Sequence, residues 1–170
     1  EQIMDLSTYV IIFIAVLFLI SGIFVVKQQT SAVVERFGKF IAIRKPGLHF
    51  KIPLIDKISG RVSLRILQLD VIVETKTKDD VFVKLKVSVQ YKVVSSSVYD
   101  AFYKLDFPQD QITSYVFDVI RAEVPKMKLD DVFEKKNDIA NAVKGELNEA
   151  MTNYGYDIIK ALVTDIDPDG

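Results

Sequence analysis

Residues 81–93 read Val-Phe-Val-Lys-Leu-Lys-Val-Ser-Val-Gln-Tyr-Lys-Val, with an apolar side chain at every odd-numbered position. A period of two is typical of a β-strand that buries one face. Residues 67–74 alternate in the same way, and the polar residues between the two runs end in Lys78-Asp79-Asp80. The two runs are therefore predicted to form an antiparallel hairpin, although Asp-Asp is weaker turn chemistry than Asp-Gly.

A second hairpin is predicted upstream, because apolar residues 32–34 and 40–43 flank the turn Arg36-Phe37-Gly38-Lys39. Gly38 stands at the turn position that needs a positive φ. Residues 50–55 should form an edge segment, since Pro53 has no N–H for a central ladder.

The period changes to that of a helix after Ser95. Three helices are expected: a short one capped by Ser95–Ser97, one that Asp110 caps and Pro125 ends, and one that opens with the capping-box pair Asp131 and Glu134. Ile139, Val143, Leu147 and Met151 lie on one face of the third helix, which Gly155 should end before a last strand over residues 158–166. Strands followed by helices and a final strand indicate an α+β fold.

The N-terminal residues 6–26 contain no charged side chain and are predicted to form a transmembrane helix after a short tail, residues 1–5. A signal peptide is disfavoured because Glu1 and Asp5 replace its basic region, and a buried core helix is disfavoured because the segment has no polar stripe. The residues assigned to the membrane are Leu6, Tyr9, Ile12, Phe13, Val16, Phe18, Ile20, Phe24 and Val26. Basic residues follow this segment and none precedes it, which places the remainder of the chain on the cytoplasmic side.

Composition excludes several classes of function. The formal net charge of −1 disfavours a nucleic-acid partner, and the absence of cysteine removes thiolate metal sites and cysteine nucleophiles. His49, the only histidine, has no serine or carboxylate at nearby alternate positions and is interpreted as structural. Gly38-Lys39 lacks the upstream glycine of a phosphate loop, and Asp165-Ile166-Asp167-Pro168-Asp169-Gly170 resembles a calcium loop but follows a strand. No catalytic residue, cofactor or metal ligand is therefore predicted.

Several segments carry a family resemblance. Residues 28–40, Gln-Gln-Thr-Ser-Ala-Val-Val-Glu-Arg-Phe-Gly-Lys-Phe, precede Pro46-Gly47-Leu48-His49-Phe50 and Ile52-Pro53-Leu54-Ile55-Asp56. They resemble the opening of the SPFH, or band 7, domain of stomatins, prohibitins and flotillins. Residues 74–83, 100–105, 115–122, 129–134 and 154–156 resemble the plant hypersensitive-induced reaction proteins and their bacterial counterparts.

The resemblance implies two subdomains, a β-rich one over residues 27–94 and an α/β one over residues 95–170, with a coiled-coil helix expected beyond Gly170. It implies a non-enzymatic membrane scaffold that assembles with itself into a large ring or cage and organises a membrane microdomain. The alternative is a regulatory adaptor that sequesters or modulates a membrane protease or another membrane-protein client. The membrane helix in place of an N-terminal lipidation glycine points to a single-pass protein of the bacterial inner membrane.

One further surface is a candidate for membrane contact. Leu48, Phe50, Ile52, Leu54 and Ile55 lie close to the predicted membrane segment and are apolar, so they either dip into the lipid interface or belong to the core. The lysines that alternate along residues 76–92 are interpreted as solvated charges that discourage edge aggregation, with contact to anionic head groups as the alternative.

Overall fold

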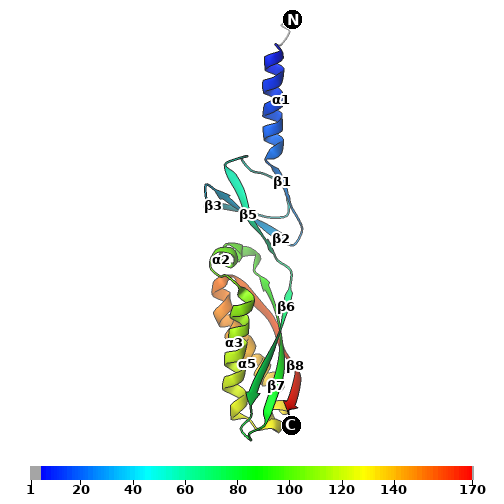
Figure 1. Ribbon diagram of the computed structural model, residues 1–170, viewed down its shortest axis with the longest axis vertical. Coiled ribbons are helices and arrows are strands. Elements are labelled where there is room, and N and C mark those ends of the chain that lie inside the picture. The colour runs from blue at the N-terminus through cyan, green and yellow to red at the C-terminus, as the bar shows by residue number, and fades with distance from the viewer. Residues whose placement is uncertain (1–4, 170) are drawn as a thin grey trace. The chain divides into compact units, whose positions relative to one another are not determined.

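The computed structural model describes residues 5–169, which form two compact units that meet in sequence between Ser63 and Leu64 (Figure 1). The N-terminal unit contains α1 (Leu6–Ser21), β1 (Ile23–Val26), β2 (Thr30–Arg36), β3 (Lys39–Arg44), β4 (Gly47–Phe50) and β5 (Asp56–Ser63). The C-terminal unit contains β6 (Leu67–Lys76), β7 (Phe82–Val93), η1 (Ser95–Ser97), α2 (Val98–Tyr103), α3 (Pro108–Glu123), η2 (Val124–Lys126), α4 (Leu129–Glu134), α5 (Lys136–Met151), η3 (Thr152–Tyr154) and β8 (Tyr156–Asp169).

Helix α1 is shorter than the sequence predicted. It ends at Ser21, and its 16 residues cover about 24 Å at about 1.5 Å per residue. None of its side chains is buried. Among residues 5–169, no helix has both the length and the apolar character that a membrane crossing requires. The transmembrane helix predicted over residues 6–26 is therefore not found.

The last part of that predicted helix is a strand with one buried face. β1 pairs antiparallel with β4, and Phe24 and Val26 are buried with Ala32 and Val34. Gly22 makes this junction possible, because a Cβ at this position would lie 2.3 Å from the carbonyl oxygen of Lys51. Phe24 and Val26, which the sequence assigned to the membrane, thus pack against protein.

The N-terminal unit has a second sheet of three strands in the order β3-β2-β5. The β2–β3 hairpin is confirmed, with Gly38 at a φ of +79° in its turn. The edge segment predicted over residues 50–55 is wrong beyond Phe50, since β4 covers Gly47–Phe50 and residues 53–55 form a turn. Strand β5 was not predicted, because its sequence, Asp-Lys-Ile-Ser-Gly-Arg-Val-Ser, has no sustained apolar alternation.

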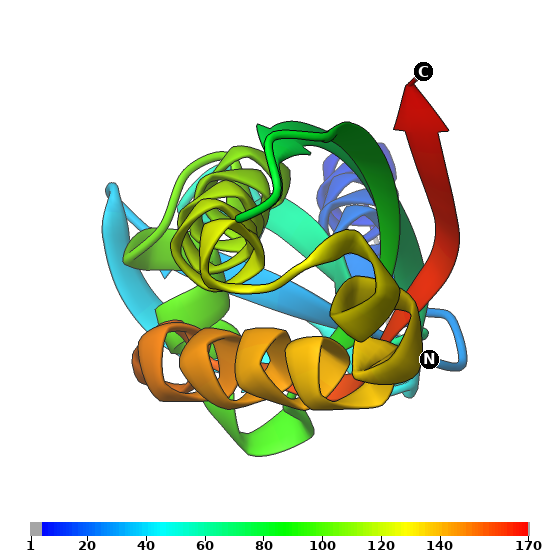
Figure 2. The same cartoon turned by 90° about the horizontal axis from the view of Figure 1, so that it is seen from below.

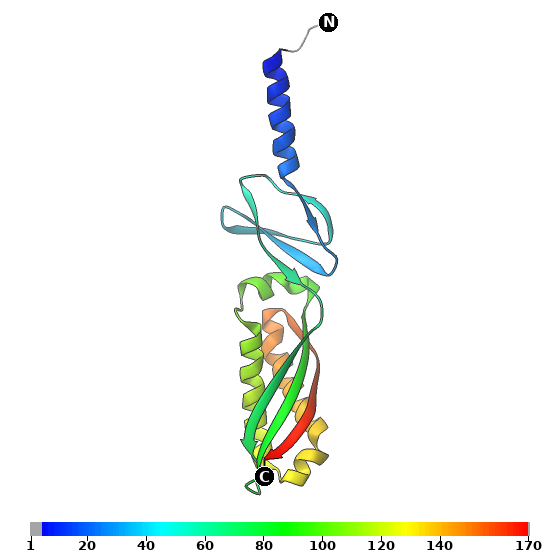
Figure 3. The same cartoon turned by 45° about the vertical axis from the view of Figure 1, so that its right-hand side comes forward.

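The C-terminal unit is built on the antiparallel sheet β6-β7-β8. The predicted β6–β7 hairpin is confirmed, and Val83, Leu85, Val87 and Val89 are buried as the alternation required. Helices α3 and α5 lie on one face of this sheet (Figures 2 and 3), with Ile139, Val143, Leu147 and Met151 of α5 in the core. Because β7 pairs with both β6 and β8, all three strands belong to the C-terminal unit, whereas the sequence interpretation grouped residues 67–93 with residues 27–94.

The helix boundaries differ from those predicted. The N-cap of α3 is Phe107, with Pro108 as its first residue, so Asp110 lies inside the first turn. The predicted third helix is divided into α4 and α5 at Lys135, and Glu134 lies at the end of α4, so no capping box forms. Local pairs of polar residues suggested caps, but Pro108 and the packing of α4 place the ends elsewhere.

Candidate membrane-contact surface

The β1–β4 pair exposes one apolar face. Ile23 lies opposite Phe50 and Val25 opposite Leu48 in the strand register. Directly opposed residues of an antiparallel pair project to the same side. All four side chains are exposed, and Leu48 is 70% exposed. We call these four residues the apolar face; it begins one residue after the C-terminal glycine cap of α1.

The other side of the same pair is structural. Phe24 and Val26 are buried there, and the His49 ring lies 5.7 Å from the ring of Phe24, centroid to centroid. His49 Nε2 lies 2.5 Å from the carbonyl oxygen of Lys45. These contacts agree with the structural interpretation of His49 and orient β4 so that Leu48 and Phe50 point outward.

A closed loop follows β4 and is held by one carboxylate. Buried Asp56 accepts hydrogen bonds from Arg36 Nε at 2.7 Å, from Arg36 Nη2 at 3.2 Å and from the backbone N–H of Ile52 at 3.0 Å. The N–H of Asp56 in turn donates to the carbonyl of Ile52 at 2.9 Å. The hydrogen bond from Arg36, and after it the one from Ile52, holds the pKa of Asp56 below its ordinary value. The same pair raises the pKa of Arg36.

Leu54 is the tip of this loop. Its φ is +69°, a left-handed conformation that a leucine adopts at a cost of about 1–2 kcal/mol, and its side chain is 94% exposed. The Asp56 bonds close the chain on both sides of Leu54 and keep it in this conformation. An exposed, strained leucine gives the protein no packing energy, which makes it a candidate for contact with something outside the chain.

All five residues that the sequence proposed for membrane contact are at the surface. Leu48 and Phe50 belong to the apolar face, Leu54 is the loop tip, and Ile52 and Ile55 flank the tip with the smallest exposure of the five. Core burial, the alternative interpretation, does not apply to any of them. The sequence analysis placed Ile23 and Val25 in the membrane helix and not on a strand face, because alternation cannot be recognised inside a run where every residue is apolar.

The lysines of the C-terminal sheet are matched by acids. Lys84 Nζ lies 3.4 Å from Glu74 Oε1, and Lys84 and Lys86 stand opposite Asp167 and Asp165 of β8 in register. The lysines of residues 76–92 therefore have acidic residues on both sides, which favours their interpretation as solvated charges over contact with head groups.

The calcium-like motif begins inside β8, so Asp165 and Asp167 lie along an extended strand. Gly170, its last residue, lies outside the described residues. Within residues 5–169 no three His, Cys, Asp or Glu side chains are grouped in a way that could hold a metal ion.

Two motif segments of the C-terminal unit meet at the β6–β7 turn. Asp79 Oδ1 accepts a hydrogen bond from Thr77 Oγ1 at 2.5 Å and another from the N–H of Leu129 at 3.1 Å. The bond from Thr77 is the main reason that the pKa of Asp79 is lowered. The hydrogen bond between Asp79 and Leu129 holds the Leu129-Asp130-Asp131 segment against the β6–β7 turn. Both segments therefore have a structural role.

Comparison with known proteins agrees with this arrangement. The model of the SPFH domain / Band 7 family matches residues 24–170, which is most of the chain. The chain belongs to this family. The match begins within β1, which is consistent with β1 being part of the folded SPFH domain.

Curated SPFH relatives include Hypersensitive-induced response protein 4 of Arabidopsis thaliana, 51% identical over 145 residues that make up 85% of this chain and 50% of that protein. Stomatin-like protein stl-1 of Caenorhabditis elegans is 32% identical over 142 residues, 83% of this chain and 43% of the relative. Human Stomatin-like protein 2, mitochondrial, is 28% identical over 83% of this chain and 39% of its own length. The chain thus spans half or less of the length of these relatives.

Proposed function

We propose that this SPFH-domain protein is a membrane-attached scaffold, held in lipid by α1, the apolar face and Leu54. The observation that carries the proposal is the continuity of exposed apolar surface along the chain. α1 is apolar on all sides and buries none of its side chains, and from Gly22 onward the exposed apolar residues continue on one side of β1 and β4. A patch of this kind on a protein surface marks an interaction site.

Lipid is the partner that fits both parts. In lipid a helix satisfies its own backbone, so α1 can lie there with every side chain facing acyl chains. Strands β1 and β4 bury Phe24 and Val26 in protein, so only their outer face contacts the interface. The loop that ends in Leu54 lies next to α1, because the N–H of Lys51 donates to the carbonyl of Gly22 at 2.8 Å. The folded units lie on the cytoplasmic side, where basic segments beside a membrane are retained.

The scaffold assembles with itself into a large ring, in which neighbouring copies pack side by side through a contact that closes by rotation. The C-terminal sheet supports this proposal, because β6 and β8 are both edge strands in the described order β6-β7-β8. Edge strands carry unpaired backbone groups that a second chain can use. Electron microscopy of the protein extracted with its native lipid should show closed assemblies; a monomer would contradict assembly, and a stoichiometric co-purifying protease would favour the adaptor function.

The membrane contact is tested with a single environment-sensitive fluorophore. The chain has no cysteine, so Leu54→Cys labelled with nitrobenzoxadiazole (NBD) reports one site in the full-length chain reconstituted into vesicles. We expect a blue-shifted emission and quenching by brominated lipids. Phe107→Cys is the matched control, since Phe107 has a φ of +53° and is 74% exposed in the C-terminal unit. Water-like emission at both positions would refute the proposed attachment.

A further inference from the structure

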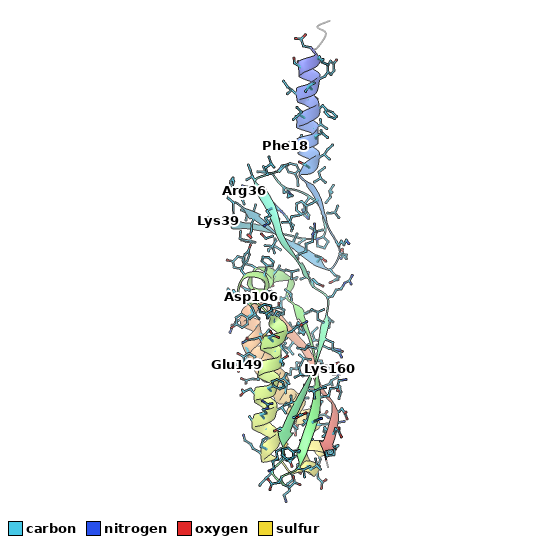
Figure 4. All side chains as sticks on the ribbon, in the orientation of Figure 1. Phe18, Arg36, Lys39, Asp106, Glu149 and Lys160 are labelled. Carbon is cyan, nitrogen blue, oxygen red and sulfur yellow. The ribbon has the colours of Figure 1, made fainter. Side chains whose placement is uncertain are left out.

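A second exposed apolar tip lies beside Leu54. Phe37 occupies the β2–β3 turn with a φ of +54° and is 82% exposed. Arg36 is opposite Asp56 in the β2–β5 register and is bonded to it. Phe37 follows Arg36 directly, and Leu54 is two residues before Asp56. Two strained, exposed apolar residues therefore flank the same ion pair, at one end of the N-terminal sheet, where Figure 4 labels Arg36 and Lys39.

Both tips adopt backbone conformations that disfavour their side chains. A left-handed conformation is far more common for glycine or asparagine than for phenylalanine or leucine. At both tips a large apolar side chain is instead held away from the core. A single such residue is a local irregularity, but Phe37 and Leu54 at the same end of the sheet together form an apolar surface that can contact a partner at two positions.

The charge around the tips is positive. In residues 35–39 and 51–57, Arg36 is matched by Asp56, and Lys57 stands opposite Glu35 in the strand register. Lys39 and Lys51 supply the excess positive charge. The pattern extends to the whole unit, because residues 1–63 contain eight Lys or Arg against four Asp or Glu, while residues 64–170 contain 14 against 19.

We propose that Phe37 and Leu54 enter the same leaflet and that Lys39 and Lys51 bind the phosphate groups of anionic lipids, so that this end of the N-terminal unit selects anionic membrane. The inference rests on the proposed membrane attachment and adds the lipid class to it. Charge complementarity favours a bilayer over a second copy as the occupant, since an equally basic copy of the same end would repel it. Each lysine close to an anionic membrane surface increases the affinity of the protein for that membrane about fivefold.

The test measures which lipid surrounds the tip. The full-length chain carrying Phe37→Cys with NBD is reconstituted into vesicles of equal parts phosphatidylglycerol and phosphatidylcholine, with a nitroxide on one lipid or on the other. We expect quenching at least twofold stronger when the nitroxide is on phosphatidylglycerol. Lys39→Gln together with Lys51→Gln should bring the ratio close to one, and so should salt of about 0.5 M, which screens head-group attraction. Lys39→Arg with Lys51→Arg keeps the charge and should keep the ratio.

Each of the other possible outcomes refutes a different part of this proposal. Equal quenching by the two lipids in the parent chain refutes the anionic selectivity and leaves the attachment intact. A water-exposed probe at residue 37 with a lipid-exposed probe at residue 54 refutes the second tip. Blue-shifted emission at residue 37 without quenching by either lipid means that the tip is buried against protein, which also refutes the inference. Water-like emission at both tips refutes the attachment itself. Circular dichroism of each labelled chain verifies that it is folded.

Discussion

Replacing Leu54 by asparagine should separate the stability of the protein from its membrane affinity. Leu54 is 94% exposed at a φ of +69°, so its side chain contributes almost no burial and its backbone is strained. Asparagine tolerates this backbone region much better than leucine. We expect Leu54→Asn to leave the free energy of unfolding unchanged or to raise it by up to about 1 kcal/mol.

The same substitution, Leu54→Asn, should lower the affinity of the protein for membranes. Burying a leucine side chain fully is worth about 1.5–3 kcal/mol, and nearly all of that area is available at Leu54. Insertion that captures about 1.5 kcal/mol corresponds to roughly a tenfold change in affinity. α1 would dominate binding in the full chain, so affinity is best measured on residues 22–170. This shortened chain keeps β1 and loses no buried side chain of α1, whereas removal of residues 1–26 would delete the core residues Phe24 and Val26.

Vesicle flotation gives the affinity and urea denaturation gives the stability. Phe107→Asn is the matched control, because Phe107 is also exposed and left-handed but belongs to the C-terminal unit. Phe107→Asn should be as stable as the parent chain or more stable, and it should bind vesicles with the same affinity. If Leu54→Asn destabilises the fold by 2 kcal/mol or more, Leu54 is packed and the reasoning is refuted. An unchanged vesicle affinity would refute its insertion.

Three further predictions concern the stability of the two folded units. Arg36 lowers the pKa of Asp56 in the folded state, so the stabilisation from this pair should be complete above the unfolded-state pKa near 4. It should be lost as the pH falls through the lower folded-state pKa. Asp56→Asn should abolish this part of the acid dependence when urea denaturation is measured over a series of pH values. Gly22→Ala should destabilise the protein by about 1–3 kcal/mol, because its Cβ would lie 2.3 Å from the backbone carbonyl oxygen of Lys51. Gly145→Ala has nothing within 4 Å of the added Cβ and should stabilise α5 by about 0.5–1 kcal/mol, so a similar effect of both variants on the melting temperature would contradict the close approach at Gly22. Leu85→Ala, at a fully buried position of β7, should cost about 2–5 kcal/mol in the same denaturation assay, and a cost below 1 kcal/mol would mean that the sheet is not packed as described.

Elements with a clear period were predictable from local sequence. Alternation over residues 81–93 identified β7, its inward face and its pairing with β6, and helical spacing identified Ile139, Val143, Leu147 and Met151 as the buried face of α5. These predictions succeed because one buried face imposes its own repeat on the residues. The family resemblance and the apolar character of Leu48 and Leu54 were also visible without coordinates.

The charge distribution needed the division into units. Over the whole chain the formal charge is −1, which hides an excess of four positive charges in residues 1–63 and of five negative charges in residues 64–170. The sequence interpretation considered the sum, the basic residues next to the apolar segment and the lysines of residues 76–92, but not the balance of charge in each unit. Where the unit boundary falls depends on the pairing of β7 with β8, which joins residues that are far apart in the chain.

The end of α1 is the clearest case that local sequence left open. Residues 6–26 are uncharged throughout, so nothing in their composition distinguishes a residue that faces outward on a helix from one that a strand buries. The pairing of β1 with β4 and the packing of Phe24 and Val26 made that choice. Strand pairing is a long-range interaction whose energy comes from the partner strand, and the same is true of the Asp56 bonds that hold Leu54 outward. Composition and period thus determined which residues are apolar and which elements repeat, while tertiary contacts decided which of those apolar residues remain exposed.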